Sequence, residues 1–166
     1  MKLNYIGIIG AILAFVSIAL PWWTWSMTYE TIGGSADLYL YQNSGTFWTS
    51  LPTADEAWFC WAALVFIILG GLLGIVGSAT GYGKKMLIGG GVLALLSIII
   101  FAVGLQNWLS SLGGLIGVFS SGSGYSSYLS YGFWLALAAM ILMFVAIIMK
   151  PKEQVTQLPS TPPAQA

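Results

Sequence analysis

The sequence lacks histidine and arginine altogether and has a single cysteine, Cys60. One cysteine excludes an intramolecular disulfide and any multi-cysteine metal site. Without histidine, neither a haem ligand pair nor a nucleophile–base set can be assembled. The formal net charge is zero, whereas nucleic-acid binding requires a clustered basic face. We therefore expect no metal or other cofactor, no nucleic-acid partner and no enzymatic activity.

Charged residues are also scarce, at 6% of the chain, whereas a soluble domain carries about 25%. Hydrophobic residues make up 58% of the 166 residues and gather in four runs, at about 3–22, 57–78, 86–105 and 131–149. Each run has the length of about 17–25 residues that a helix needs to cross a bilayer. No run contains Asp, Glu, Lys or Arg, which argues against a proton-coupled transporter or an ion path.

The charged residues that flank these runs are sorted by side. All five lysines lie at one end (Lys2, Lys84, Lys85, Lys150 and Lys152), and four of the five acids lie at the other (Glu30, Asp37, Asp55 and Glu56). Because lysines next to a span stay in the cytoplasm, we predict a multi-pass protein of the cell membrane with both termini cytoplasmic. Residues 1–149 would form an all-α, four-transmembrane-helix bundle, and residues 150–166 a disordered cytoplasmic tail.

The first run has a second interpretation. Because Met1-Lys2 precedes it, the run has the form of a cleaved signal peptide. Its length and the aromatic pair Trp22-Trp23 at its end favour a retained helix with an interfacial anchor.

Residues 23–50, in the first outer loop, alternate in a way that is typical of strands. Trp23 and Trp25 fall on one face, and Thr24 and Ser26 on the other. We predict a small antiparallel sheet in this first extracellular loop. Its strands lie near 23–31, 37–42 and 46–49, with a break at Gly33-Gly34 and a turn at Asn43-Ser44-Gly45.

Two further segments border the outer loops. A capping box at Thr53-Ala54-Asp55-Glu56 predicts the start of the second helix. Residues 108–119 are uncharged and would either extend the third helix or lie in the membrane interface. Residues 120–130 are rich in Gly, Ser and Tyr, and we expect them to be mobile, or ordered only against a partner.

Tryptophan and tyrosine are abundant near the predicted outer side. Trp22, Trp58 and Trp61 are expected in an aromatic belt at headgroup depth. If Leu38 and Leu40 pack inward, then Tyr39 and Tyr41 face outward. Trp23, Trp25 and Trp48 would either pack under the sheet or face a partner. The candidate partner contacts, of types that dominate binding hot spots, are Trp23, Trp25, Tyr39, Tyr41, Trp48, Tyr125 and Tyr128.

Small residues recur at four-residue spacing within the spans. They are Gly70, Gly74 and Ser78 in the second run and Gly90 and Ala94 in the third. Such stripes let helix backbones approach closely in lipid. We interpret them as helix packing within the bundle, with self-association as the alternative.

Leu20-Pro21-Trp22-Trp23, Gly45-Thr46-Phe47-Trp48 and Cys60 together resemble the pattern of the claudin and peripheral-myelin-protein tetraspan superfamily. The chain departs from that pattern, since the first loop cysteine and the arginine before the second helix are absent. The resemblance implies a non-enzymatic protein that acts by lateral assembly and outer-loop contacts, with itself or other membrane proteins as partners. The alternative function is a small accessory subunit of a larger respiratory or transport complex, and a pore or enzyme is the third.

Overall fold

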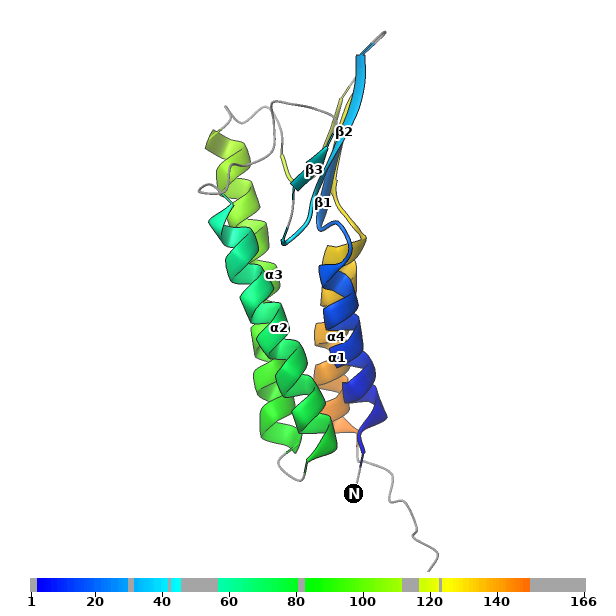
Figure 1. Cartoon of the computed structure of the whole chain (residues 1–166), viewed down its shortest axis with the longest axis vertical. Helices are drawn as coiled ribbons and strands as arrows, with labels where there is room; N and C mark the ends of the chain where they lie inside the picture. Colours follow the sequence, from blue (N-terminus) through cyan, green and yellow to red (C-terminus); the bar gives the residue numbers. More distant parts are fainter. Residues whose placement is uncertain are drawn as a thin grey trace, which may run out of the picture.

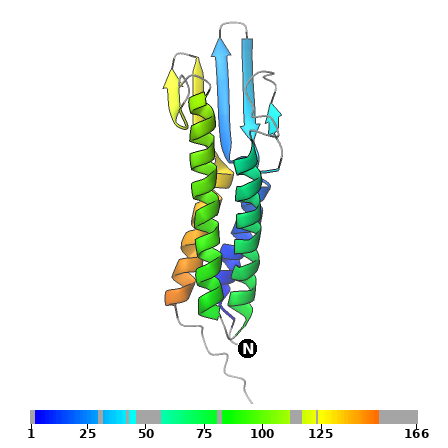
Figure 2. The same ribbon diagram turned by 90° about the vertical axis from the view of Figure 1, so that its left-hand side faces the viewer.

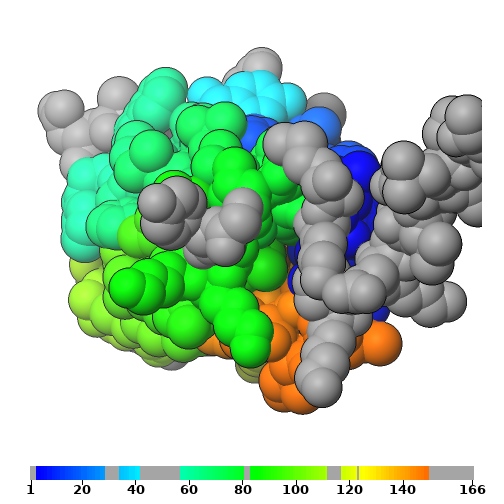
Figure 3. Space-filling model, turned by 90° about the horizontal axis from the view of Figure 1, so that it is seen from below, coloured from blue at the N-terminus to red at the C-terminus, as the bar shows by residue number. Residues whose placement is uncertain are grey.

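Four helices form a bundle in the computed structural model, which describes residues 3–29, 32–41, 43–45, 57–80, 83–111, 117–122 and 124–149. They are α1 (Tyr5–Ile18), α2 (Trp58–Ala79), α3 (Gly83–Ser111) and α4 (Tyr131–Ile148). Helix α1 packs on α2 and α4, and α3 packs on the same two helices (Figure 1). Seen from the end opposite the sheet, α1 (blue), α2 and α3 (green) and α4 (orange) lie side by side (Figure 3).

Three of these helices, α2, α3 and α4, are long and apolar enough to cross a membrane. Helix α1 has only 14 residues, fewer than the first apolar run. It ends early because Pro21 disfavours the helical conformation at the residue before it. The last turn tightens as the amide of Ala19 donates to the Val16 carbonyl at 3.1 Å, and the chain then continues as a strand.

A five-stranded antiparallel sheet stands beyond the ends of α1 and α4 (Figures 1 and 2). Its strands are β1 (Trp23–Tyr29), β2 (Ile32–Leu38), β3 (Asn43–Gly45), β4 (Ser120–Gly122) and β5 (Tyr125–Leu129), in the order β3-β2-β1-β5-β4. The first outer segment therefore supplies three neighbouring strands, and the second outer segment completes the sheet on the other edge of β1.

The predicted sheet is present, but two of its predicted boundaries are wrong. Strand β2 covers 32–38 and not 37–42, so Gly33-Gly34 lies inside a strand, where it pairs with Thr28 and Met27. The predicted turn at Asn43–Gly45 is strand β3, because it pairs with Ala36–Leu38. The predicted strand at 46–49, the capping box at 53–56 and the tail from residue 150 lie outside the described residues.

The prediction for residues 120–130 is also wrong, because most of them form β4 and β5. A glycine at the turn and pairing with β1 make this hairpin possible. Gly124 adopts a positive φ of 89° at the turn, a conformation that glycine takes at little cost. Strand β5 then pairs with β1 from Trp23 to Met27, so the tertiary partner, and not local propensity, orders this segment.

Close contact between α2 and α3 depends on glycine. A Cβ added to Gly90 would lie 2.7 Å from the Gly70 carbonyl oxygen, and one added to Gly70 would lie 2.9 Å from the Gly90 carbonyl oxygen. The other small residues of the two stripes, Gly74, Ser78 and Ala94, are also buried. Ser97 adds an interhelical bond, donating from Oγ to the Ala63 carbonyl at 2.7 Å.

We predict that Gly90→Ala lowers the free energy of unfolding by about 1–3 kcal/mol, because the methyl group would force two backbones apart. Gly89→Ala is the matched control, since its Cβ would meet only the movable end of the Leu73 side chain, at 3.3 Å. The control should be neutral or stabilising by up to about 1 kcal/mol, from helix propensity. Unfolding in detergent, followed by circular dichroism, measures both. Equal effects would contradict the tight α2–α3 contact.

Candidate interaction surface

The sheet has two chemically different faces. On β1, Trp23 and Trp25 are buried while Thr24 and Ser26 are not, as the alternation predicts. The register places Ala36 and Leu38 of β2 and Leu129 of β5 on the face of the two tryptophans. These five side chains are each 8% exposed or less, so the inner face is an apolar core.

The inner face packs toward the end of α3. Trp23 meets Trp108 edge to face, with ring centroids 6.3 Å apart, and Trp108 and Leu109 are buried. Of the two alternatives for Trp23 and Trp25, the structure has them packed under the sheet. The third tryptophan of that set, Trp48, lies outside the described residues.

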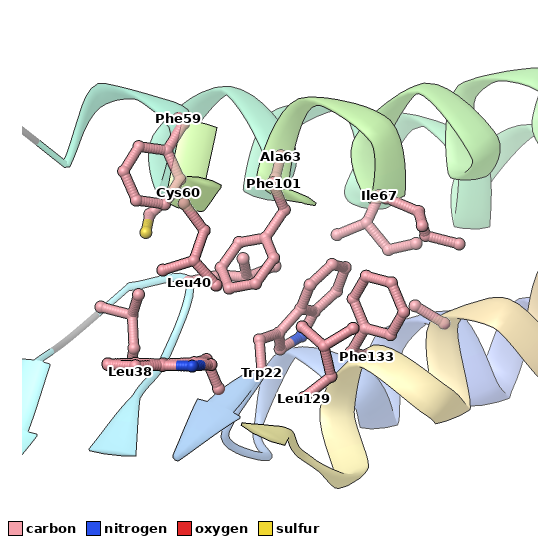
Figure 4. Close-up of a cluster of buried hydrophobic side chains, with 14 of the residues drawn as sticks. Trp22, Leu38, Leu40, Phe59, Cys60, Ala63, Ile67, Phe101, Leu129 and Phe133 are labelled. Atoms are coloured by element: carbon pink, nitrogen blue, oxygen red, sulfur yellow. The ribbon is translucent and has the colours of Figure 1, made fainter. Parts of the chain in front are cut away.

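Trp22 is not in an aromatic belt, which corrects the expectation from its position in the sequence. Its side chain is 0% exposed and lies between Phe101 and Phe133 (Figure 4). Its indole N–H donates to the Ser17 carbonyl at 2.9 Å. The turn at Pro21 points this ring into the bundle, and Gly132 leaves room for it, since a Cβ there would lie 2.5 Å from the indole Cδ1.

The structure leaves the first pair of candidate tyrosines accessible. Leu38 and Leu40 are buried, at 0% and 1% exposed, and point toward Phe59 and Cys60 at the start of α2 (Figure 4). Tyr39, between the two leucines in the sequence, is half-buried, and Tyr41, which follows Leu40, is 46% exposed. The ring centroids of the two tyrosines are 5.9 Å apart. The two rings therefore form a small aromatic unit at the foot of the sheet.

The second pair is split between the two faces. Tyr128 pairs with Thr24 and lies on the outer face, 45% exposed. Tyr125 pairs with Met27 on the inner face, where its ring lies over Gly122 of β4. Tyr125 and Tyr128 therefore do not form one surface.

The outer face is lined with hydroxyl groups. The register brings Thr24, Ser26 and Thr28 of β1 beside side chains from the other strands. These neighbours are Ser35 and Asp37 from β2, Ser126 and Tyr128 from β5 and Ser121 from β4. Two cross-strand hydrogen bonds connect them: Thr24 Oγ1 donates to Asp37 Oδ1 at 2.8 Å, and Ser26 Oγ lies 2.7 Å from Ser126 Oγ.

Three exposed aromatic residues near this face were not singled out from the sequence. Phe119, Tyr131 and Trp134 are 64%, 74% and 51% exposed. Tyr131 begins α4, and Trp134 donates its indole N–H to the Leu129 carbonyl at 3.1 Å. The three-residue spacing of Tyr131 and Trp134, which places both on one side of a helix, was the available signal for these two residues.

Within the described ranges, Asp37 is the only carboxylate side chain, and no group of three His, Cys, Asp or Glu residues could hold a metal ion. The described part of the sheet therefore offers hydroxyl and phenol groups and one carboxylate for recognition. No family model matches the chain, and no curated protein matches it.

Trp22 and Trp23 allow a matched test of the core. The Trp22 indole N–H has a carbonyl acceptor, whereas the Trp23 indole N–H is buried and has no acceptor among the described residues. We predict that Trp22→Phe lowers the free energy of unfolding by at least about 1 kcal/mol more than Trp23→Phe, because only the first change removes a hydrogen bond. Chemical unfolding of both variants in the same detergent measures the difference. An equal or larger loss for Trp23→Phe would contradict this role of Trp22.

Proposed function

We propose that the chain is a non-enzymatic tetraspan membrane protein that acts by lateral assembly and by contacts of its outer sheet. The observation that carries this proposal is the construction of the sheet. Both outer segments combine into one surface at one end of an apolar bundle, and its exposed groups are suited to recognition. Exposed tyrosines such as Tyr41 and Tyr128 are of a type that often dominates binding energy at interfaces.

Continuous exposed apolar stripes on the helices support the membrane placement. On α2, the residues 40% or more exposed recur every three or four positions and end at an adjacent pair: Trp58, Trp61, Val65, Leu69, Leu72, Ile75 and Val76. On α4, the corresponding stripe runs from Tyr131 and Trp134 through Ile141 to Ile148. In water such stripes would be large exposed apolar patches, which monomeric soluble proteins avoid, whereas in a bilayer they face lipid.

Three hydrogen bonds at the two ends of the segment that contains α1 favour a fourth span. At one end, Asn4 donates from Nδ2 to the Ala146 carbonyl at 2.7 Å and from its amide to the Ser78 carbonyl at 3.0 Å. At the other end, Gly132 donates its amide to the Pro21 carbonyl at 2.8 Å. Residues 4–21 therefore run the same distance as most of α4, so a bilayer crossed by α4 would be crossed by this segment too.

The orientation rests on residues of α3. Lys84 and Lys85 are exposed at its first turn, at the end opposite the sheet, where lysines favour the cytoplasm. At its other end the exposed side chains change to Gln106, Asn107 and Ser110. A helix of 29 residues is about 43 Å long, longer than a hydrocarbon core of about 30 Å, so its last turns would leave the membrane beside the sheet.

The resemblance to the claudin and peripheral-myelin-protein superfamily supports the same function. It implies four spans, cytoplasmic termini and a sheet in the first outer loop, and the observed sheet includes strands from that loop. An accessory subunit of a larger respiratory or transport complex is the alternative, and the identity of the captured partners distinguishes the two.

The proposed topology predicts opposite labelling of two exposed positions. In a Cys60→Ser background, Ser35→Cys on β2 should react with an impermeant maleimide in intact cells. Lys85→Cys, at the start of α3, should react only after the membrane is permeabilised. The reverse pattern would overturn the orientation, and labelling of both in intact cells would overturn the membrane placement.

The contact function predicts that Tyr39→Ala combined with Tyr41→Ala weakens association by about 2 kcal/mol, in the range of hot-spot truncations. Affinity capture from native membranes, with wild type and variant side by side, measures this as reduced recovery of partners or of a second tagged copy. Tyr5→Ala is the control, because Tyr5 is 59% exposed at the opposite end of the bundle. Unchanged recovery with the double variant would rule out this tyrosine face, and recovery of unrelated large subunits would favour the accessory role.

A further inference from the structure

We propose that the outer face of the sheet docks the uncharged sugar headgroup of a glycolipid in the surrounding leaflet; this rests on the membrane placement proposed above. The docking row consists of Asp37, Thr24 and Tyr128, which the register aligns across β2, β1 and β5.

The position of the row points to a lipid. The inner face of the sheet turns toward α3, as the Trp23–Trp108 contact requires, so the outer face turns away from α3, above α1 and α4 (Figure 1). Below the row, the chain continues directly into the exposed residues Tyr131 and Trp134 of α4. A lipid with its acyl chains along α4 thus has its headgroup beside Tyr128.

The height of the row selects a long headgroup. Tyr128 precedes Tyr131, the first residue of α4, by three residues, which is about 10 Å of extended chain. The headgroup layer of one leaflet is about 5–8 Å thick. The row therefore lies at the water side of that layer, above the depth of phosphates and within reach of a sugar that extends from the lipid surface.

The charge of the row selects a neutral headgroup. Asp37 is the one carboxylate among the described residues, and the two described lysines, Lys84 and Lys85, lie at the far end of the bundle. Among the described residues, an anionic phosphate headgroup at this row meets a carboxylate and no cation, which is unfavourable. An uncharged sugar headgroup is not repelled by the Asp37 carboxylate.

The chemistry of the row fits a polyhydroxylated ligand. The Thr24 hydroxyl donates to Asp37 Oδ1 at 2.8 Å, which fixes the carboxylate and leaves its other oxygen to accept from sugar hydroxyls. Tyr128, 45% exposed, offers a ring face to the C–H side of a sugar and a phenol that both donates and accepts. The neighbouring Ser26 and Ser126 have short side chains, so the face beside the row is flat.

The test is lipid enrichment around the full-length protein. The protein is placed in nanodiscs that contain phosphatidylcholine, phosphatidylglycerol and diglucosyl diacylglycerol with the same acyl chains. Lipids that remain with the protein after mild extraction are quantified by mass spectrometry. We expect diglucosyl diacylglycerol to be enriched about fivefold or more over phosphatidylcholine, and phosphatidylglycerol not to be enriched.

Two variants and a control separate the row from the fold. Tyr128→Ala and Asp37→Asn should each remove most of the enrichment, and the first leaves the Thr24–Asp37 hydrogen bond in place. Thr28→Ala, on the same face of β1 but further from the bilayer, should keep it. Circular dichroism checks that all three fold.

Several results would overturn the proposal. They are an equal uptake of all three lipids, a preference for phosphatidylglycerol, or enrichment that Tyr128→Ala leaves intact. Equal affinity for the same disaccharide without its diacylglycerol would assign the face to a free glycan instead of a lipid. A protein that does not enter nanodiscs would contradict the membrane placement, whereas one that enters and shows no preference contradicts only this inference.

Discussion

The attachment of Trp22 holds the sheet to the bundle. Its indole N–H bonds to the Ser17 carbonyl at 2.9 Å, its amide donates to the Leu38 carbonyl at 2.8 Å, and its carbonyl accepts from the Ser130 amide at 2.9 Å. One residue therefore joins the end of α1, the end of β2 and the start of α4. Because Trp22 is 0% exposed, water cannot replace these hydrogen bonds, and leaving the groups unpaired would cost several kcal/mol.

The parts of the fold with a strong local pattern were predictable. The ends of α2 and α4 lie within about two residues of the predicted runs, and the alternation on β1 correctly separated Trp23 and Trp25 from Thr24 and Ser26. Strand β5 was missed because it is short, contains two serines and stands in a Gly/Ser-rich segment. Its order comes from β1, whose partner residues are about a hundred positions away in the chain. Trp22 was misplaced because hydropathy marks where a span ends but not how the chain turns there.

The candidate surface was predictable to the same limited extent. Leu38 and Leu40 identified the outward positions of Tyr39 and Tyr41, because alternate residues of an extended chain point to opposite sides. The same rule separates Tyr125 from Tyr128, but it needed a strand that the sequence did not reveal. Whether Trp23 and Trp25 were covered depended on Trp108, and hence on how far α3 continues past the third apolar run.

The pairing of β1 with β5 also sets an order for folding. Strand β1 leaves the ribosome about a hundred residues before β5, which at about 5–20 residues per second is a delay of about 5–20 s. During that interval one edge of β1 carries unpaired amide and carbonyl groups, and such an edge invites pairing with another chain. The nascent protein is therefore vulnerable to misassembly until β5 has been made, and a chain truncated after α3 would keep that open edge permanently.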